Sequence, residues 1–375
     1  MPSLRKPDES NPAHCRALHP VLSPMRAPTS DDMTTILFPE ADERSDSRGE
    51  KGPRARALAS RPSVGDSVFR ATAFAAGGIT VAIMLAVGFF LTLRGGDALS
   101  VAGTSFLTTQ EWSPETRTFG IAAVLFGTAT IALVAMVFSV PLATGTALLI
   151  SEVIPPRLRS LLISLVDLMA AVPSVVYGLW GLFFLQQNVI PVAQWISHYF
   201  GWIPFFAVTD ADGSPMTDAS QFTSSAFIAG IVVALMVAPT QTSVMREAFS
   251  QAPVGEREGA LALGSTRWGM IRTVVLPFGR GGMIGGTMLG LGRAMGETIA
   301  VYLIISPIFT INWQVLKTGS NSVSALIALR YGEASEFGLS ALMAAGLALF
   351  LITLVINFTA STIVARSRSG AQSES

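Results

Sequence analysis

The sequence predicts an all-α integral membrane protein with six membrane-spanning helices, and three observations support this fold class. Half of the 375 residues are hydrophobic (50%) and only 13% are charged, whereas soluble domains carry about 25% charged residues. Apolar stretches long enough to cross about 30 Å of hydrocarbon recur along the chain. Basic residues are concentrated in alternate loops between these stretches, which is typical of a multi-pass membrane protein.

The predicted spans each offer the roughly 20 mostly apolar residues that a helix needs to cross a bilayer. Two of the early spans contain a proline in their apolar run. Pro141 should kink the second span or let its end leave the membrane, and Pro173 should bend the third. The spans cover residues 71–93, 119–150, 160–186, 225–248, 281–309 and 338–364.

The distribution of Lys and Arg predicts the orientation, because short loops rich in these residues stay in the cytoplasm. The basic segments are the N-terminal tail, 151–159, 249–280 and the C-terminal tail. These segments, and with them both termini, are expected on the cytoplasmic side. Segment 187–224 contains no Lys or Arg and is expected outside, as an aromatic interfacial segment or a surface that receives a binding protein. Its aromatic rings include Trp195, His198, Tyr199 and Trp202.

The expected organisation is one membrane domain between two polar tails. Residues 1–68 are rich in Pro, Ser, Asp, Glu and Arg. Such a segment cannot bury enough apolar surface to fold alone, so we expect a disordered cytoplasmic tail. The membrane domain is expected over 69–366, and 367–375 should form a second cytoplasmic tail.

Several site chemistries are excluded by composition. The chain has a single cysteine and three scattered histidines, which excludes a disulfide framework and a cysteine-rich metal site. Its three lysines are Lys6, Lys51 and Lys317, and none of them follows a glycine. A nucleotide-binding P-loop needs a Gly-Lys pair followed by Ser or Thr. We therefore expect no cofactor in this chain and no ATPase or other enzyme activity of its own.

A charged pair lies inside the fifth predicted span. Arg293 is about twelve residues into that span, which at about 1.5 Å per residue places it about 18 Å deep, near the midplane. Glu297 follows one turn later on the same helix face. Charges at bilayer depth are costly and mark functional sites. The pair could neutralise itself and aid packing, bind an anionic substrate through Arg293, or form a gate.

The same span carries small residues at four-residue spacing, namely Gly282, Gly286 and Gly290, with Gly292 and Gly296 beyond them. Small residues let helix backbones approach closely. We expect the stripe to pack against a partner permease subunit, with a backbone-lined substrate path as the alternative.

The basic segment 249–280 predicts two short helices. The first should run from Pro253 to Leu263 and stop at Gly264, since proline suits a first turn and glycine a helix end. Ser265 or Thr266 can cap the second, which should continue until Pro277. A short amphipathic helix at the membrane surface can dock a cytosolic partner, or it can be a simple connector at headgroup level.

This segment resembles the EAA loop of binding-protein-dependent ABC importer permeases, E-A-A-x3-G-x9-I-x-L-P. Gly259 replaces the middle alanine of the motif and Val274 replaces the isoleucine. The resemblance implies a six-helix type I importer permease of the MetI-like fold, with a cytoplasmic coupling helix that fits a groove on an ATPase. The matching residues are Glu258, Gly259, Ala260, Gly264, Val274, Leu276 and Pro277.

A second resemblance concerns the substrate. The segment from Gly292 to Thr298, GRAMGET, resembles the GRAxGET signature of the phosphate importer permeases. Two further segments resemble the C subunit of the Pst system: the continuation of this motif, Ile299 to Val301, and DLMAAVPSVVYGLWG at 167–181. The resemblance covers roughly residues 70–366. It implies that Arg293 and Glu297 line the phosphate path.

The two resemblances together imply a complete transporter. This chain would pair with a second permease subunit in the bacterial inner membrane, among its lipids. Two cytosolic ATPase subunits would bind ATP and Mg, and an extracytoplasmic phosphate-binding protein would deliver phosphate. A permease for another oxyanion, such as sulfate or molybdate, and a non-transporting membrane assembly subunit are the alternatives. No feature of the chain indicates a nucleic-acid partner.

Overall fold

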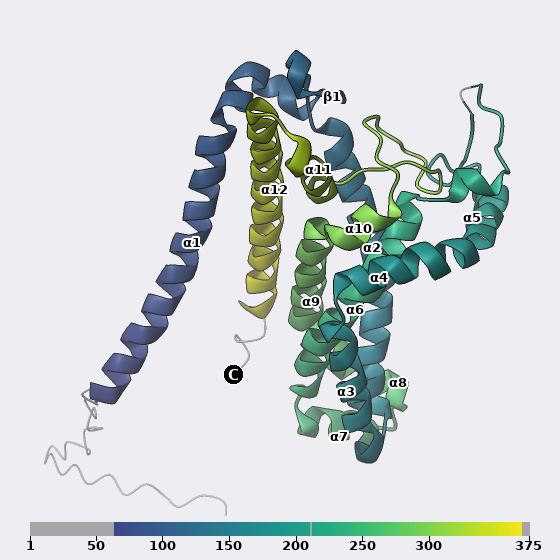
Figure 1. Cartoon of the computed structure of the whole chain (residues 1–375). Helices are drawn as coiled ribbons and strands as arrows, with labels where there is room; N and C mark the ends of the chain where they lie inside the picture. Colours follow the sequence, from purple (N-terminus) through teal and green to yellow (C-terminus); the bar gives the residue numbers. More distant parts are fainter. Residues whose placement is uncertain (1–63, 211, 370–375) are drawn as a thin grey trace, which may run out of the picture. The chain divides into compact units, whose positions relative to one another are not determined.

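The computed structural model describes residues 64–210 and 212–369 (Figure 1). Contacts divide the chain into two units, Met1–Ser67 and Val68–Ser375. The predicted disordered tail therefore lies almost wholly outside the described residues. The predicted C-terminal tail does so from residue 370 onwards.

The described chain is mainly helical and contains one small antiparallel pair of strands, in which Trp112 faces Phe119. The helices are α1 (Val64–Ala102), α2 (Ala122–Leu148), α3 (Pro156–Ala171), α4 (Ser174–Trp180), α5 (Gln186–Phe200), α6 (Ala226–Ser250), α7 (Val254–Ala262), α8 (Arg267–Met270), α9 (Leu276–Gly296), α10 (Ile299–Ile304), α11 (Val323–Arg330) and α12 (Glu336–Ser369), and the strands are β1 (Trp112–Ser113) and β2 (Thr118–Phe119). Three π-helical turns extend or join helices, at Leu149–Val153, Gly181–Leu185 and Ile271–Val275. Short 3-10 turns lie at Gly103–Leu107, Pro114–Thr116, Ala219–Phe222 and Tyr331–Glu333.

Six helices in the described residues are long and apolar enough to cross a membrane, as the sequence predicts. The third and the fifth helices differ in their bounds from the predicted spans. The second span contains Pro141 and remains helical through it. The six helices are Gly65–Leu107, Ala122–Val153, Ser174–Phe200, Ala226–Ser250, Arg267–Gly296 and Glu336–Thr359.

The third predicted span, 160–186, is not one bent helix. Val172 and Pro173 both have extended backbone, so α3 ends before them and a separate helical run begins at Ser174. Proline disfavours helical backbone in the residue before it, which explains a full break in place of a bend. The helix long enough to span therefore runs to Phe200.

The fifth predicted span, 281–309, begins and ends too late. The helix starts at Arg267 and continues through Pro277 to Gly296, so the second loop helix does not stop at Pro277. The π-helical turn Ile271–Val275 precedes the proline, and such a wider turn relieves the clash of a proline ring with the preceding turn. The chain then leaves the helix at Glu297.

The central helix is α6, whose most apolar stretch is 72% buried, whereas that of α1 is not buried at all. Helices α2, α6 and α9 lie side by side, with α6 packed against both others (Figure 1). The C-terminal part of α1 packs on the start of α12, where the Ser340 hydroxyl donates to the Arg94 carbonyl at 2.8 Å. Most exposed side chains in the middle of α1 are apolar, and Phe69 and Phe74 near its start are exposed as well, as expected of a helix that faces hydrocarbon.

The glycine stripe of α9 packs inside the chain, against α6. A Cβ at Gly282 would collide with Ala248, and one at Gly290 would collide with the Gln241 side chain. This corrects the expectation that the stripe packs against a partner subunit. The pattern alone indicated a close helix contact but did not identify the helix.

The α6–α9 contact predicts an asymmetry between two neighbouring glycines. We expect Gly282→Ala to lower the thermal stability of the detergent-solubilised protein, because overpacking costs about 1–3 kcal/mol. Gly285→Ala is the matched control, since nothing lies within 4 Å of its added methyl group and alanine is favoured over glycine in helices by roughly 0.5–1 kcal/mol. Equal melting temperatures for the two variants would contradict the packing described here.

Candidate functional site

The predicted pair Arg293 and Glu297 lies at a break between two helical segments. Arg293 is in the last turn of α9 and its side chain is exposed. The backbone of Glu297 is extended, with φ −66° and ψ 128°. Arg293 therefore sits at the end of a helix, and not midway along one as the span prediction required. Discontinuous helices of this kind form substrate sites in many transporters.

Both the side chain and the backbone carbonyl of Glu297 accept hydrogen bonds at the break. Its Oε1 accepts a hydrogen bond from the Ala300 backbone N–H at 3.2 Å, at the start of α10. Its backbone carbonyl accepts one from the Ser324 hydroxyl at 2.7 Å, on α11. These two bonds satisfy polar groups on both sides of the break and tie it to a neighbouring helix.

Arg293 and Glu297 do not form an ion pair. Among the described side chains, ion pairs form between Arg257 and Glu152 and between Arg330 and Glu333, whereas Arg293 forms neither an ion pair nor a hydrogen bond with any of them. The interpretation that the two charges neutralise each other thus fails in this structure. The spacing of four residues implied a shared face only if the helix continued, and it does not.

Arg293 lines a cavity of about 470 Å³ between α9 and α12. Gly292 and Gly296 expose backbone there, while Thr353 and Asn357 supply polar side chains from α12. An arginine fork beside amide and hydroxyl groups, without a paired carboxylate, is suited to an oxyanion. The remaining lining residues are Met288, Leu289, Gly346, Leu349 and Phe350.

The second sequence motif, 167–181, meets the first at α10. Helix α4 packs on α10, where a Cβ at Gly178 would lie 2.9 Å from Cα of Ala300. The Tyr177 hydroxyl reaches back across the α3–α4 break and donates to the Met169 carbonyl at 3.0 Å. The structure thus packs together the two helices that follow these breaks, although the sequence motifs are 125 residues apart at Asp167 and Gly292.

The predicted coupling helix forms as α7, within one residue of the expected ends. Gly264 has φ +84°, a left-handed conformation that favours glycine after a helix. The Thr266 hydroxyl accepts from the Gly269 N–H at 3.1 Å and caps α8. Leu276 and Pro277, the last residues of the motif, begin α9.

Helix α7 has one exposed face and one face turned toward the protein. Glu258 and Leu261 are exposed, and Leu263, next to the helix end, is 90% exposed. Ala260 is half-buried and packs against a cluster that includes Phe249. Of the motif residues on α7, Glu258 and Gly259 are therefore available to a partner, whereas Ala260 serves packing.

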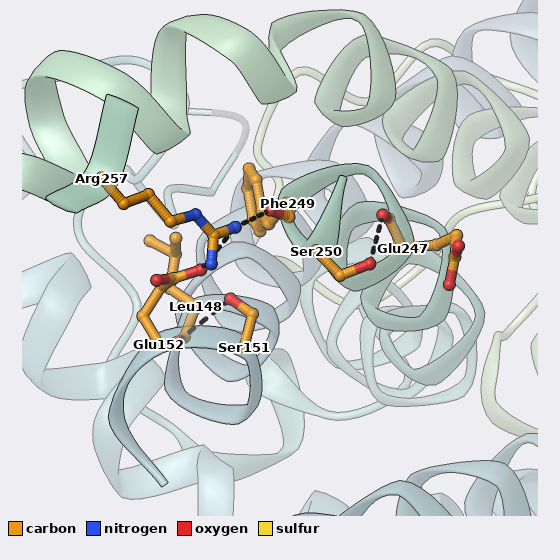
Figure 2. A network of polar contacts seen from close by, with 7 residues as sticks. All are labelled: Leu148, Ser151, Glu152, Glu247, Phe249, Ser250 and Arg257. Atoms are coloured by element: carbon orange, nitrogen blue, oxygen red, sulfur yellow. Dashed lines mark hydrogen bonds and ion pairs between the residues drawn. The ribbon is translucent and has the colours of Figure 1, made fainter. Parts of the chain in front are cut away.

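The sequence reasoning missed one contact of this region, between Arg257 of α7 and Glu152 after α2 (Figure 2). The two residues are 105 positions apart. No spacing rule relates them, so only the tertiary structure could identify the pair. A weaker signal existed, because both charges fall in loops that the sequence predicts on the cytoplasmic side.

Comparison with known proteins decides the family. The pattern of the family described as "Binding-protein-dependent transport system inner membrane component" matches residues 139–369. The chain belongs to this family. It is thus a multi-pass membrane component of a transport system, as the coupling-loop resemblance implied.

Among similar proteins is "Phosphate transport system permease protein PstC 2" of Mycobacterium bovis, 36% identical over 82% of this chain and 94% of that protein. The protein PstC of Xylella fastidiosa, also called a phosphate transport system permease protein, is 33% identical over 89% of this chain and 98% of its own length. That of Pasteurella multocida is 37% identical over 73% and 83%. These names confirm the resemblance to phosphate permeases.

The fold has a counterpart among solved structures. A chain of the bacterial alginate ABC transporter, in complex with an alginate pentasaccharide-bound periplasmic protein, aligns with a TM-score of 0.52. The alignment covers 80% of this chain and 96% of that chain at 17% identity. At this identity the likeness shows the fold alone, and it confirms the expected six-helix importer permease architecture.

The contacts of Glu297 predict that its hydrogen bond matters more than its charge. We expect Glu297→Gln to keep an acceptor for the Ala300 N–H and to melt near the wild type. Glu297→Ala leaves that N–H unsatisfied, at a cost of about 1–3 kcal/mol, and should lower the melting temperature in detergent. Glu333→Ala, an exposed carboxylate 3.9 Å from Arg330, is the control. An equal fall in melting temperature for Glu297→Gln and Glu297→Ala would show that the stability depends on the charge of Glu297 and not on its hydrogen bond.

Proposed function

We propose that this chain is a membrane-spanning permease subunit of an ATP-driven phosphate importer. One observation carries the proposal: an exposed arginine that has no ionic partner among the described residues lies at a helix break, in a segment that resembles the signature of phosphate permeases. The chain's 33–37% identity to proteins named as phosphate permeases supports the same substrate.

Arg293 would bind phosphate by charge-assisted hydrogen bonds during passage. Its guanidinium can donate two parallel bonds to one phosphate. A phosphate crossing hydrocarbon needs compensating donors, and Asn357 and Thr353 lie in the same cavity. Glu297 would act indirectly, by holding the break between α9 and α10 on which Arg293 stands.

The proposed assembly contains this chain, a second permease subunit and two cytosolic ATPase subunits, with a phosphate-binding protein outside. The ATPases would bind ATP and Mg, since this chain has no Gly-Lys sequence and a P-loop needs one. We place the chain in the bacterial inner membrane with both termini in the cytoplasm. In this orientation the exposed face of α7 meets the ATPase.

Sulfate and molybdate are the main alternatives as substrates, because an arginine fork also fits other tetrahedral oxyanions. They become outcomes of the uptake measurement below. A non-transporting assembly subunit would leave Arg293 and the exposed coupling helix without a role.

The Arg293 hypothesis predicts a graded loss of uptake. In cells that carry the complete transporter, we expect Arg293→Gln to assemble but to lose most phosphate uptake. Loss of a charge-assisted hydrogen bond costs about 1.5–3 kcal/mol, which corresponds to roughly 10-fold to 100-fold in rate. Arg293→Lys should recover part, because lysine cannot form the fork.

Arg330→Gln is the control for this series, since Arg330 is exposed and 3.9 Å from its carboxylate partner. Normal uptake by Arg293→Gln would remove Arg293 from the path. Uptake of labelled sulfate or molybdate that exceeds phosphate uptake in the wild type would reassign the substrate.

The coupling hypothesis predicts that the outer face of α7 contacts an ATPase. A cysteine at Leu261, which is exposed, should cross-link to the ATPase and react with thiol reagents only from the cytoplasmic side. Gly264→Pro should abolish transport without blocking insertion, because a proline cannot adopt the positive φ found there. Labelling of Leu261→Cys from outside the cell would overturn both the orientation and the docking surface.

A further inference from the structure

We propose that Arg257 is a positioning residue that locks the coupling helix α7 to the cytoplasmic ends of α2 and α6, so that movement of α7 reaches Arg293. The inference rests on the proposed function, since it assigns α7 the role of contacting an ATPase. It concerns the inward face of α7, which lies away from the exposed docking surface.

Arg257 makes two contacts with two different membrane helices (Figure 2). Its Nη2 lies 3.3 Å from Oε1 of Glu152, in the π-helical turn that extends α2. The same nitrogen donates to the Phe249 backbone carbonyl at 2.5 Å, in the last turn of α6. A cation at this position also complements the partial negative charge at a helix C-terminus.

Burial makes this contact more consequential than a surface ion pair. The side chain of Glu152 is 5% exposed and that of Arg257 is 19% exposed. Exposed pairs contribute little, whereas separating a buried pair leaves an uncompensated charge. Helix α7 therefore cannot shift alone without stranding the Glu152 carboxylate, and we infer that the ends of α2 and α6 move with it.

The rest of α7 is held mainly by the segment that follows it. Its principal helix contacts are with α8 and the π-helical turn before α9. Its outer residues are exposed. Arg257 thus supplies the polar link from α7 to α2 and α6.

A continuous packed route leads from this link to Arg293. The ring of Phe249 lies where a Cβ at Gly279 of α9 would stand, and the α6–α9 contact continues past Gly286 to Gly290. Arg293 follows one turn beyond Gly290. A displacement of the α6 end can therefore reach the phosphate-binding arginine through closely packed helices.

The pair also has an unused second arrangement. Within the described residues, neither Nε of Arg257 nor Oε1 of Glu152 forms a hydrogen bond, although Nη2 lies at ion-pair distance. An arginine can bind a carboxylate through two parallel bonds. A small movement of α7 would let Nε join the contact, so the pair can be loose in one transporter state and bidentate in another.

The test measures phosphate transported per ATP hydrolysed by the complete transporter in liposomes, with its binding protein. Glu152→Gln removes the charge but keeps the shape and the Arg257–Phe249 bond. Glu152→Asp keeps the charge and withdraws it by one methylene. Arg257→Gln and the double variant Glu152→Gln/Arg257→Gln complete a cycle. Glu247→Gln is the matched control, since Glu247 is an exposed carboxylate near the end of α6 (Figure 2).

We expect Glu152→Gln and Arg257→Gln to lower the phosphate-to-ATP ratio about tenfold, a typical coupling between separate sites, while ATP hydrolysis continues. The ratio of the double variant should be no lower than that of the more damaged single variant, because both substitutions remove the same Arg257–Glu152 contact. Glu152→Asp should lie between Glu152→Gln and the wild type, and Glu247→Gln should match the wild type. A purely structural role would reduce the amount of assembled complex but leave its ratio unchanged.

A wild-type ratio in assembled Glu152→Gln complexes would overturn the proposal and leave the proposed function standing. The substrate assignment fails separately, if the wild-type complex hydrolyses ATP without carrying phosphate. In that case the role of the Arg257–Glu152 contact is tested by measuring how far the binding protein stimulates ATP hydrolysis. Glu152→Gln should reduce this stimulation and Glu247→Gln should not. If Glu152→Gln complexes do not assemble, the same ratio is measured for Glu152→Asp. A phosphate-to-ATP ratio equal to that of the wild type in this variant would overturn the proposal.

Discussion

The close contact between α6 and α9 is the constraint on which the rest of the membrane domain depends. Glycines at 279, 282, 286 and 290 bring the two backbones together. An added methyl group at these positions would collide with α6 or make an unusually tight contact with it. Because apolar burial gives helices little drive to associate inside a lipid bilayer, such close van der Waals packing carries much of the stability. The contact also sets the place of Arg293, which follows the stripe directly.

The helix breaks beside this core are stabilised by hydrogen bonds to side chains. Unsatisfied backbone groups in hydrocarbon are costly, so irregular backbone at membrane depth must be satisfied by protein or a polar cavity. Glu297 and Ser324 satisfy groups at one break, and Tyr177 satisfies one at the other. Glu297 is thereby engaged with the backbone, and Arg293 keeps its donors for another ligand. A charge that looked like half of an ion pair has a structural task instead.

The coupling segment and the arginine site belong to one continuous body of packed helices. The exposed face of α7 is directed away from it, while Arg257 and Ala260 connect α7 to the ends of α2 and α6 and to the cluster around Phe249. This division of one short helix into an exposed face and a packed face explains how the EAA-like motif can combine exposed residues with a packed alanine. The motif spacing alone did not separate these tasks.

The sequence by itself determined the class, the number of spans, the short helix α7 and the arginine motif. Long apolar runs, Gly264 and Thr266 act locally, so their effects can be read without knowing the fold. Only the tertiary structure decided that the glycine stripe faces α6, that Glu297 accepts a hydrogen bond from the first turn of α10, and that Arg257 meets Glu152. These outcomes depend on which surfaces pack together and on where a helix ends, and residues far apart in the chain settle both.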